Sequence, residues 1–419
     1  MTPLQRAILD EVDASFAEQV AFLADLVRLP SDNPPGDCGA HGARTAELLM
    51  QLGHAVETHV VGADDLAAAG MQSARNLIVR QSFGLPGPCI ALNAHGDVVA
   101  PGAGWSVDPY GALIRDDPRH GPVMYGRGVA VSKSDFATYS FALRALQRLV
   151  ARGGLRLCGA VELHFTYDEE VGGEIGPAWL LRKGLSRPDL ALSAGFAYAV
   201  TTAHNGCLHL EVTVHGRQGH AAMPQAAVDA LEAATGVLAA LYASRAALAE
   251  VHSATPGIDT PTLNVGLISG GINTNVVPDR VCFRIDRRII PEESAEAAEA
   301  ALRTLITEAA GHYPGIRVDI ERRMLAQPLV KLPGAERLTA ALQRHGEAFL
   351  GTPIAEHGVP LYTDARHYAA AGIPTVLYGA GPRTLAEANG HGADECLRLG
   401  DLRAATATVA AMLAELLAA

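Results

Sequence analysis

Two clusters of polar residues in this sequence have the types and spacing that chemistry requires. His95 and Asp97 stand two residues apart, and in an extended segment this spacing puts both side chains on one face, where a carboxylate can orient an imidazole. Glu169 and Glu170 are adjacent carboxylates followed by Val171 and two glycines. Like charges in a partly buried site repel each other unless a cation or a shared proton relieves them. The two clusters therefore indicate a metal site or a proton-transfer site.

Apolar runs that predict buried strands precede both clusters. Such runs cover residues 89–93, 157–165, 189–193 and 373–377. Helical patterns alternate with them, for example over 44–52 and 136–149, so we expect an α/β fold whose mostly parallel central sheet is flanked by helices. Ligands bind beyond the carboxyl ends of strands in such sheets, and His391 also follows the last of these strands. The polar residues after the strands should therefore lie close together.

A second domain is predicted inside the first. The chain has 419 residues, which exceeds what a single core usually supports. From residue 206 to 324 the order of elements changes to β-α-β-β-α-β, which predicts a ferredoxin-like unit. We therefore expect a discontinuous α/β domain over 1–205 and 325–419, and a smaller inserted domain over 206–324.

Composition excludes several classes of function. The net charge of −12 argues against a nucleic-acid partner and favours a small-molecule substrate. The six cysteines show no CxxC spacing, which is typical of reduced thiols in a cytoplasmic protein. The N-terminal segment carries acidic residues in an amphipathic pattern, unlike a signal peptide, and no apolar run is long enough for a membrane span.

Ordered sequence blocks carry a family resemblance from about residue 20 to the C-terminus. They include AHGDVVAPGAGWSVDPY, MYGRG, FTYDEEVGGEIGP, GRQGHAAMP, NTNVVPDRVCFRIDRR, YTDAR and GIPTVLYGAGP. This series resembles the zinc-dependent aminoacylase and carboxypeptidase family, which includes acetylornithine deacetylase, succinyl-diaminopimelate desuccinylase and carboxypeptidase G. The resemblance implies a dinuclear metal site and hydrolysis of a C–N bond.

The resemblance also implies a role for each residue of the two clusters. His95 is similar to a ligand of one metal ion, whereas Glu170 and His391 are similar to ligands of the other. Glu169 matches the general base that activates water, and Asp97 matches the residue that orients a ligand.

Three residues of the inserted domain also match functional positions of the family. His220 is similar to the histidine that stabilises the oxyanion in the partner's active site, which implies a homodimer formed through the lid. Asn275 and Arg288 are similar to lid groups that bind the substrate carboxylate. An ion pair with Asp286 is the alternative interpretation of Arg288.

Two expected carboxylate ligands are missing. Val131 stands where the family has the aspartate that bridges both ions, and Gly195 stands where it has a further acidic ligand. Two dications about 3.5 Å apart repel by about 19 kcal/mol at an effective dielectric of 20, which the bridging carboxylate normally offsets. We therefore expect one divalent ion per chain, zinc or manganese, bound by His95, Glu170 and His391.

Three other residues could compensate for the missing ligands, but each has a more ordinary interpretation. Asp135 lies at the predicted start of a helix, where an aspartate is typically an N-cap. His204 is more simply a polar loop residue. Lys133 is one of three lysines in the chain and is more simply the partner of a nearby acid.

The sequence leaves three functional hypotheses. The first is a metal-dependent hydrolase of an amide-type C–N bond in a small carboxylate-bearing substrate, with Glu169 as base. The second is a hydrolytic deaminase of an amino-aromatic acid, because Phe196 and Tyr198 could stack on a ring, although wall packing is their simpler role. The third is a catalytically silent homologue that binds a small carboxylate.

Overall fold

The computed structural model describes all 419 residues and divides them into two units. The first contains Met1–Thr202, Lys331–His357 and Thr363–Ala419, and the second contains Ala203–Val330 and Gly358–Tyr362. The sequence pattern placed these boundaries after residues 205 and 324. The first boundary differs because strand β8 (Ala199–His204) is followed after one residue by β9 (Gly206–His215). No loop therefore marks the point where the chain passes from the first unit to the second.

An eight-stranded sheet organises the first unit, in the order β1-β2-β6-β3-β7-β16-β8-β15. Besides β8, its strands are β1 (Val56–Val60), β2 (Arg75–Ser82), β3 (Cys89–His95), β6 (Ala160–Thr166), β7 (Leu190–Ser193), β15 (Ala355–Val359) and β16 (Thr375–Leu377). The pairs β3–β6, β3–β7 and β7–β16 are parallel, whereas β1–β2, β2–β6 and β16–β8 are antiparallel. The predicted α/β fold with a parallel sheet centre is confirmed.

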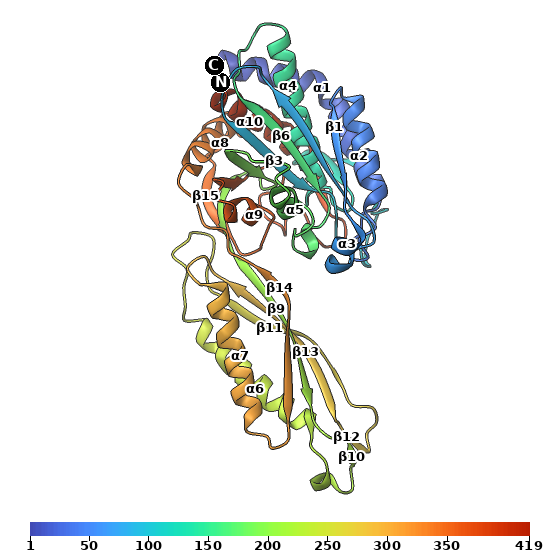
Figure 1. The fold of residues 1–419 in the computed structure, drawn as a ribbon. Coiled ribbons are helices and arrows are strands. Elements are labelled where there is room, and N and C mark those ends of the chain that lie inside the picture. Colours follow the sequence, from blue (N-terminus) through green and yellow to red (C-terminus); the bar gives the residue numbers. More distant parts are fainter. The chain divides into compact units, whose positions relative to one another are not determined.

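Helices cover both faces of this sheet (Figure 1). The larger core includes residues of α1 (Pro3–Arg28), α2 (Gly39–Gln51), α4 (Lys133–Ala151), α8 (Ala335–Leu350) and α10 (Leu399–Leu416). A smaller core includes Ala91 and Ala191 of the sheet and Tyr368, with Leu181 packed against it. These last two residues belong to α9 (Ala365–Ala370) and α5 (Pro177–Arg182). The short α3 (Ala63–Ala69) has no buried residues. No helix of the structure is both long enough and apolar enough to span a membrane.

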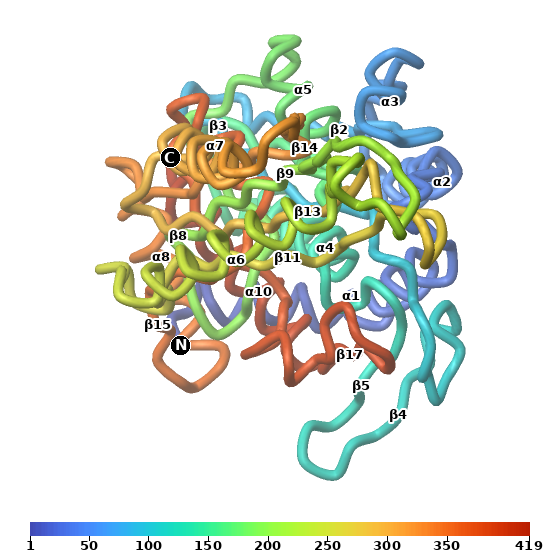
Figure 2. The backbone as a smooth tube through the Cα atoms, turned by 90° about the horizontal axis from the view of Figure 1, so that it is seen from below, coloured from blue at the N-terminus to red at the C-terminus, as the bar shows by residue number.

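A three-stranded sheet was missed by the sequence pattern. It has the order β17-β5-β4, with β4 (Leu113–Asp117), β5 (Gly121–Tyr125) and β17 (Cys396–Arg398). The backbone trace shows β17 beside the β4–β5 hairpin although about 270 residues separate them in sequence (Figure 2). The hairpin strands are short and largely exposed, so their sequences lack the apolar signal of a buried strand.

The second unit has the predicted ferredoxin-like fold. Its antiparallel sheet has the order β11-β13-β9-β14, and its remaining elements are α6 (Ala230–Leu248), β11 (Thr262–Gly270), β13 (Arg280–Ile289), α7 (Ala295–Gly311) and β14 (Arg317–Ala326). Alternate residues of β9 and β13 are buried in a separate core with α6 and α7. A short ribbon of β10 (Gly219–His220) and β12 (Val276–Val277) extends this unit.

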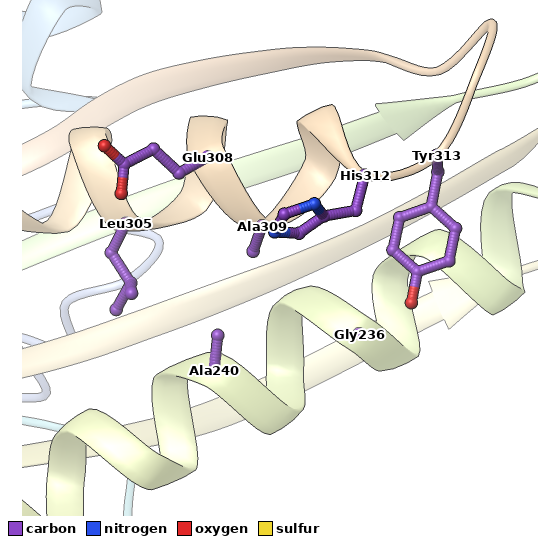
Figure 3. Close-up of a pocket in the computed structure, with 7 residues that line it drawn as sticks. All are labelled: Gly236, Ala240, Leu305, Glu308, Ala309, His312 and Tyr313. Carbon is purple, nitrogen blue, oxygen red and sulfur yellow. The ribbon is translucent and has the colours of Figure 1, made fainter.

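The two helices of the second unit lie side by side and enclose a small hollow (Figure 3). Its volume is about 260 Å³. Tyr313 lies beside Gly236, whose missing side chain leaves room for the tyrosine ring. Glu308, His312 and Tyr313 are the only ionisable residues of the lining, and they do not form a set of groups that suggests chemistry.

Candidate active site

The two polar clusters meet at one edge of the first unit's sheet. His95 is the last residue of β3 and is paired in register with Thr166, the last residue of β6. A single 3-10 turn, Glu169–Val171, follows β6 after two residues. One ligand atom each from His95, Glu169 and Glu170 lies within 4.8 Å of the others. Parallel pairing of two neighbouring strands therefore brings together residues that are 74 positions apart.

Asp97 fixes the geometry of both clusters. Its buried carboxylate accepts hydrogen bonds from the backbone N–H groups of Glu169 at 3.2 Å and Glu170 at 3.1 Å. It also accepts one from Asn33 Nδ2 at 2.9 Å. The Nδ1 atom of His95 lies 3.0 Å from the Asp97 backbone oxygen and 3.3 Å from its carboxylate. These contacts direct the other ring nitrogen of His95, Nε2, toward Glu169 at 3.9 Å.

His391 reaches the cluster from the loop between β16 and β17. Its Nε2 atom lies 3.3 Å from Glu170 Oε1, and its backbone has the left-handed φ of 62°. The loop is held by Arg127, whose Nη2 donates to the His391 carbonyl at 3.3 Å. His391 is not among the three residues whose ligand atoms lie within 4.8 Å of one another. Its imidazole is half exposed, so rotation of the ring could bring it closer to His95.

Excess negative charge dominates the electrostatics of the site. Burial raises the pKa of Glu169 well above its usual range, His95 opposes this, and Glu170 and Asp364 reinforce it. Burial lowers the pKa of His95, but the carboxylates of Glu169 and Asp97 outweigh burial and raise it well above the usual range. For His391, the contact with Glu170 raises the pKa. The buried carboxylates therefore favour a bound positive charge.

Asp364 is a member of this cluster that sequence reasoning missed. Burial raises its pKa to about 7, and its charge also raises the pKa of Glu169. It begins a segment that holds the turn after the glutamate pair, because Arg366 and His367 both contact the carbonyl oxygen of Gly172. The matched block YTDAR was the signal for this residue, but nothing in the block indicated which neighbour it meets.

The two departures from the family pattern differ in structure. Val131 is half-buried, and its backbone N–H donates at 3.2 Å to Glu395, which forms a buried ion pair with Arg127 at 2.6 Å. At Gly195 a Cβ atom would lie 2.7 Å from Tyr378 N and 2.9 Å from Leu377, closer than real Cβ contacts come. At residue 195 the surrounding backbone therefore excludes the missing carboxylate, whereas at residue 131 a valine side chain simply stands in place of the carboxylate.

The predicted N-cap role of Asp135 is wrong. Ser132 is the N-cap residue of α4, and Asp135 lies inside its first turn. The Asp135 carboxylate accepts hydrogen bonds from Gly195 N at 3.1 Å and Ala380 N at 2.7 Å. Burial raises its pKa to about 7. Asp135 thus joins α4 to the backbone at the position where the family's further acidic ligand is missing.

The interpretation of Lys133 as the partner of a nearby acid is also wrong. Its buried ammonium donates to the carbonyl oxygens of Leu26 at 3.1 Å and Leu29 at 3.2 Å, at the C-terminus of α1. Cations are favoured at this end of a helix. His204 belongs to the second unit, where its Nδ1 lies 3.3 Å from Leu329 N.

The predicted lid residues lie within the second unit. His220 is exposed on β10, and its Nδ1 accepts from Ala222 N at 3.0 Å. Asn275 lies beside it, because its carbonyl oxygen accepts from Ala221 N at 3.0 Å. Arg288 forms the alternative ion pair with Asp286, with Nε 3.0 Å from Oδ1. The structure therefore brings His220 and Asn275 together and places Arg288 on the neighbouring sheet.

The aromatic residues proposed to stack on a substrate ring have partners of their own. The hydroxyl of Tyr198 donates to Asp401 at 2.7 Å, and the guanidinium of Arg383 lies 4.0 Å from the centre of its ring. Phe196 lies in a β-bridge with Gly381. The simpler role of these residues, packing of the wall, fits these contacts better than a stacking surface.

The residues present fit one divalent ion. Glu170 Oε1 is buried, and its one polar neighbour, His391 Nε2 at 3.3 Å, does not form a well-directed hydrogen bond, so the atom has capacity to bind a cation. Imidazole nitrogens with carboxylate oxygens are ligands that zinc and manganese accept. A second ion would lack the bridging carboxylate, because residue 131 is a valine.

Comparisons with known proteins agree with this architecture. Residues 202–314 match the family described as the M20 peptidase dimerisation domain. The succinyl-diaminopimelate desuccinylase of Methylobacterium radiotolerans is 28% identical over 398 residues, covering 91% of this chain and 93% of that protein.

Two solved structures share the fold. Human carnosine dipeptidase 1 has a TM-score of 0.75 at 17% identity, with 99% of each chain covered. The M20 family metallo-carboxypeptidase of Sulfolobus solfataricus also has a TM-score of 0.75, at 15% identity, covering 95% of this chain and 98% of that one.

Proposed function

We propose that this chain is a member of the zinc aminoacylase and carboxypeptidase family and that it hydrolyses an amide-type C–N bond in a small carboxylate-bearing molecule. One observation carries the proposal: Glu169 lies in a buried group with His95 and Glu170, at the carboxyl ends of two parallel strands. Relatives named as a desuccinylase and a dipeptidase cleave bonds of this type, which supports the choice of reaction.

Each residue of the cluster has a distinct task in this reaction. His95, Glu170 and His391 hold a divalent ion, and the ion supplies Lewis-acid chemistry to the scissile carbonyl group. Glu169 takes a proton from the attacking water and later passes it to the leaving nitrogen. The raised pKa of Glu169 suits a group that must hold a proton at neutral pH. Asp97 keeps His95 and the glutamate turn in position.

We propose one ion per chain, zinc or manganese. Val131 offers no bridging oxygen, and Gly195 has no space for a side chain. The repulsion of about 19 kcal/mol between two close dications would then be offset only by the remaining carboxylates. His391 would complete the ligand set by rotating its half-exposed ring from its contact with Glu170.

The second unit supplies substrate binding and dimerisation in this proposal. The M20 dimerisation domain supports a homodimer, in which His220 stabilises the oxyanion in the neighbouring subunit's site. Asn275 and Arg288 bind the substrate carboxylate, for which the planar guanidinium is well suited. The six free cysteines fit a reducing, cytoplasmic compartment.

Metal analysis and substrate assays on the same sample test the function. We expect about one ion per chain at the cluster around Glu169, and turnover of N-acyl amino acids or dipeptides that is lost with a chelator. Two ions bound at this cluster at full activity would contradict the single-ion site. Release of ammonia from amino-aromatic acids would favour the deaminase instead. The contacts of Tyr198 with Asp401 and Arg383 are evidence against that function, because they occupy the ring proposed to stack on the substrate. Turnover of neither class, without bound metal, would leave a silent carboxylate-binding protein.

A further inference from the structure

A second cluster of metal-ligating side chains lies on the sheet of the second unit. Cys207 and His209 are two residues apart on β9, so their side chains lie on the same face of the strand. Asp286 on β13 is paired in register with His209, and Arg288 is paired with Cys207. The intervening Leu208 and Leu210 are buried in the core with α6 and α7. The four polar residues therefore form a square on the face that points away from the helices.

The ligand atoms of this cluster have the separations of a small metal site. Cys207 Sγ lies 3.3 Å from His209 Nε2, which lies 2.9 Å from Asp286 Oδ2. The remaining distance, from Cys207 Sγ to Asp286 Oδ2, is 3.7 Å. Bonds of 2.0–2.3 Å to a tetrahedral zinc ion require separations of about 3.3–3.8 Å. Only the distance between His209 and Asp286 must lengthen, by about half an ångström.

The same cluster does not form a nucleophilic relay. A cysteine–histidine–aspartate relay uses one imidazole nitrogen for the thiol and the other for the carboxylate. Here Nε2 of His209 makes both contacts, which is the arrangement of ligands that face one point. A thiolate, an imidazole and a carboxylate are each ligand types that zinc accepts.

Arg288 stabilises the carboxylate of this cluster. Its Nε and Nη2 atoms lie 3.0 Å and 3.2 Å from the two oxygens of Asp286, which fixes the orientation of the carboxylate. The side chains of His209 and Asp286 are 39% and 28% exposed, which leaves an ion a path to the buried Cys207.

We propose that Cys207, His209 and Asp286 form a binding site for one thiophilic divalent cation, of the zinc type, in the second unit. The cation takes one sulfur, one nitrogen and one oxygen ligand, and water fills the fourth position. Cys207 loses its proton to solvent when the cation binds, because thiolate is the ligand form. None of these ligands belongs to the cluster around Glu169, so this proposal can be tested independently of the proposed hydrolase activity.

Cobalt provides the test, because it replaces zinc and reports thiolate ligation through a charge-transfer band in the near-ultraviolet. The full chain is stripped of metal with a chelator and titrated with Co²⁺. We expect this band to saturate at one equivalent and to disappear in C207S. It should remain in C38S, which removes the other buried cysteine, and in E170Q, which alters a proposed metal ligand in the first unit.

A second variant and a matched control keep the test decisive. We expect H209N to weaken Co²⁺ binding at the thiolate site at least tenfold. His215 lies on the same strand, six residues beyond His209, and contacts Asp319 at 2.8 Å instead of Asp286, so H215N should leave the titration unchanged. Absence of the band in the wild-type protein, or a band of equal strength in C207S, would overturn the proposal. If C207S does not fold, an unchanged titration of H209N would overturn it as well.

Discussion

The proposed site depends on two residues of different kinds: Glu169 is the proposed base, and Gly195 leaves no space for a further carboxylate ligand. The proposed role of Glu169 comes from the sequence, because a glutamate pair after a strand in a family-like block indicates a base beside a ligand. The sequence could not show the structural consequence of Gly195. A glycine that has only lost a carboxylate and a glycine whose surroundings exclude any side chain are the same letter in a sequence. Only the 2.7 Å approach of Tyr378 N distinguishes them. Residue types thus predicted which side chains would act in the site, whereas packing determined that residue 195 cannot carry a ligand.

Replacement of Glu169 tests its role as the base. We expect E169Q to lower kcat by a factor of about 10² to 10⁴, the usual contribution of general base catalysis. The amide keeps the size of the side chain, and the proposed ligands are His95, Glu170 and His391, so the metal content should stay at the wild-type level. Steady-state kinetics and metal analysis of the same sample check both expectations. Activity near the wild-type value would contradict the assignment.

Gly195 should not accept a side chain. We expect G195A to lower the free energy of unfolding by about 1–3 kcal/mol, because its Cβ would meet Tyr378 and Leu377. Gly400 is a matched control in the same unit, since no atom lies within 4 Å of its Cβ position. G400A should be neutral or slightly stabilising in its helix. Urea denaturation monitored by circular dichroism distinguishes the two variants, and equal stabilities would refute the steric argument.

Lys133 gives the protein an alkaline pH dependence. Burial lowers its pKa from 10.5 to about 8, so the unfolded chain binds this proton more tightly than the folded one. Stability therefore rises as the pH increases from about 8 to 10.5, and the increase attributable to Lys133 is about 3 kcal/mol. K133M removes the titrating group, so the difference in unfolding free energy between wild type and variant should change by this amount. A constant difference across that pH range would show that Lys133 does not titrate there.

The turn after β6 is the element on which the site depends. It holds Glu169 and Glu170, and two different segments support it: Asp97 binds its N–H groups, while Arg366 and His367 of α9 contact the oxygen of Gly172. The sequence predicted the strand and the glutamates correctly. It could not predict the supports, because they depend on contacts between segments that are about 70 and 190 residues apart. The β4–β5 hairpin was missed for the related reason that its partner β17 is distant in sequence.

Weakening one of these supports should weaken metal binding. We expect D97N to lower metal affinity by about 10- to 100-fold, because an amide cannot accept from two N–H groups and orient His95 as a carboxylate does. Asp117 is the control, since its carboxylate also binds two backbone N–H groups but in the exposed hairpin. Isothermal titration of stripped protein with Zn²⁺ should show the loss in D97N and none in D117N. Equal affinities of the two variants would contradict the supporting role.

The whole molecule is expected to work as a dimer. Its second unit matches the M20 dimerisation domain, and the exposed position of His220 fits a residue that serves a neighbouring site. The sequence predicted the two-part organisation because the order of elements changes near residue 206. It placed the boundaries three and six residues away from those observed, since β8 runs through the first boundary and the second lies four residues beyond the end of β14.

Complementation between inactive variants tests this arrangement. E169Q and H220N should each be inactive as homodimers, whereas co-expression should restore about a quarter of the wild-type activity per chain. The reason is that half of randomly formed dimers are mixed, and each mixed dimer has one site with both an intact Glu169 and the partner's intact histidine. Light scattering confirms that the mixture is dimeric. No recovery of activity in a dimeric mixture would place His220 in its own subunit's site or outside catalysis.

The way in which the second unit begins and ends has an evolutionary consequence. Cys207 near the start of β9 is paired directly with Ala326 near the end of β14, so the two ends of this unit lie side by side. A segment with adjacent ends can be inserted into or removed from a host chain with little distortion of either. Residues 203–330 thus have the construction of an exchangeable module, with only Gly358–Tyr362 contributed from outside it. A lineage could acquire a new lid, and with it a new substrate, while the sheet that carries Glu169 stays unchanged.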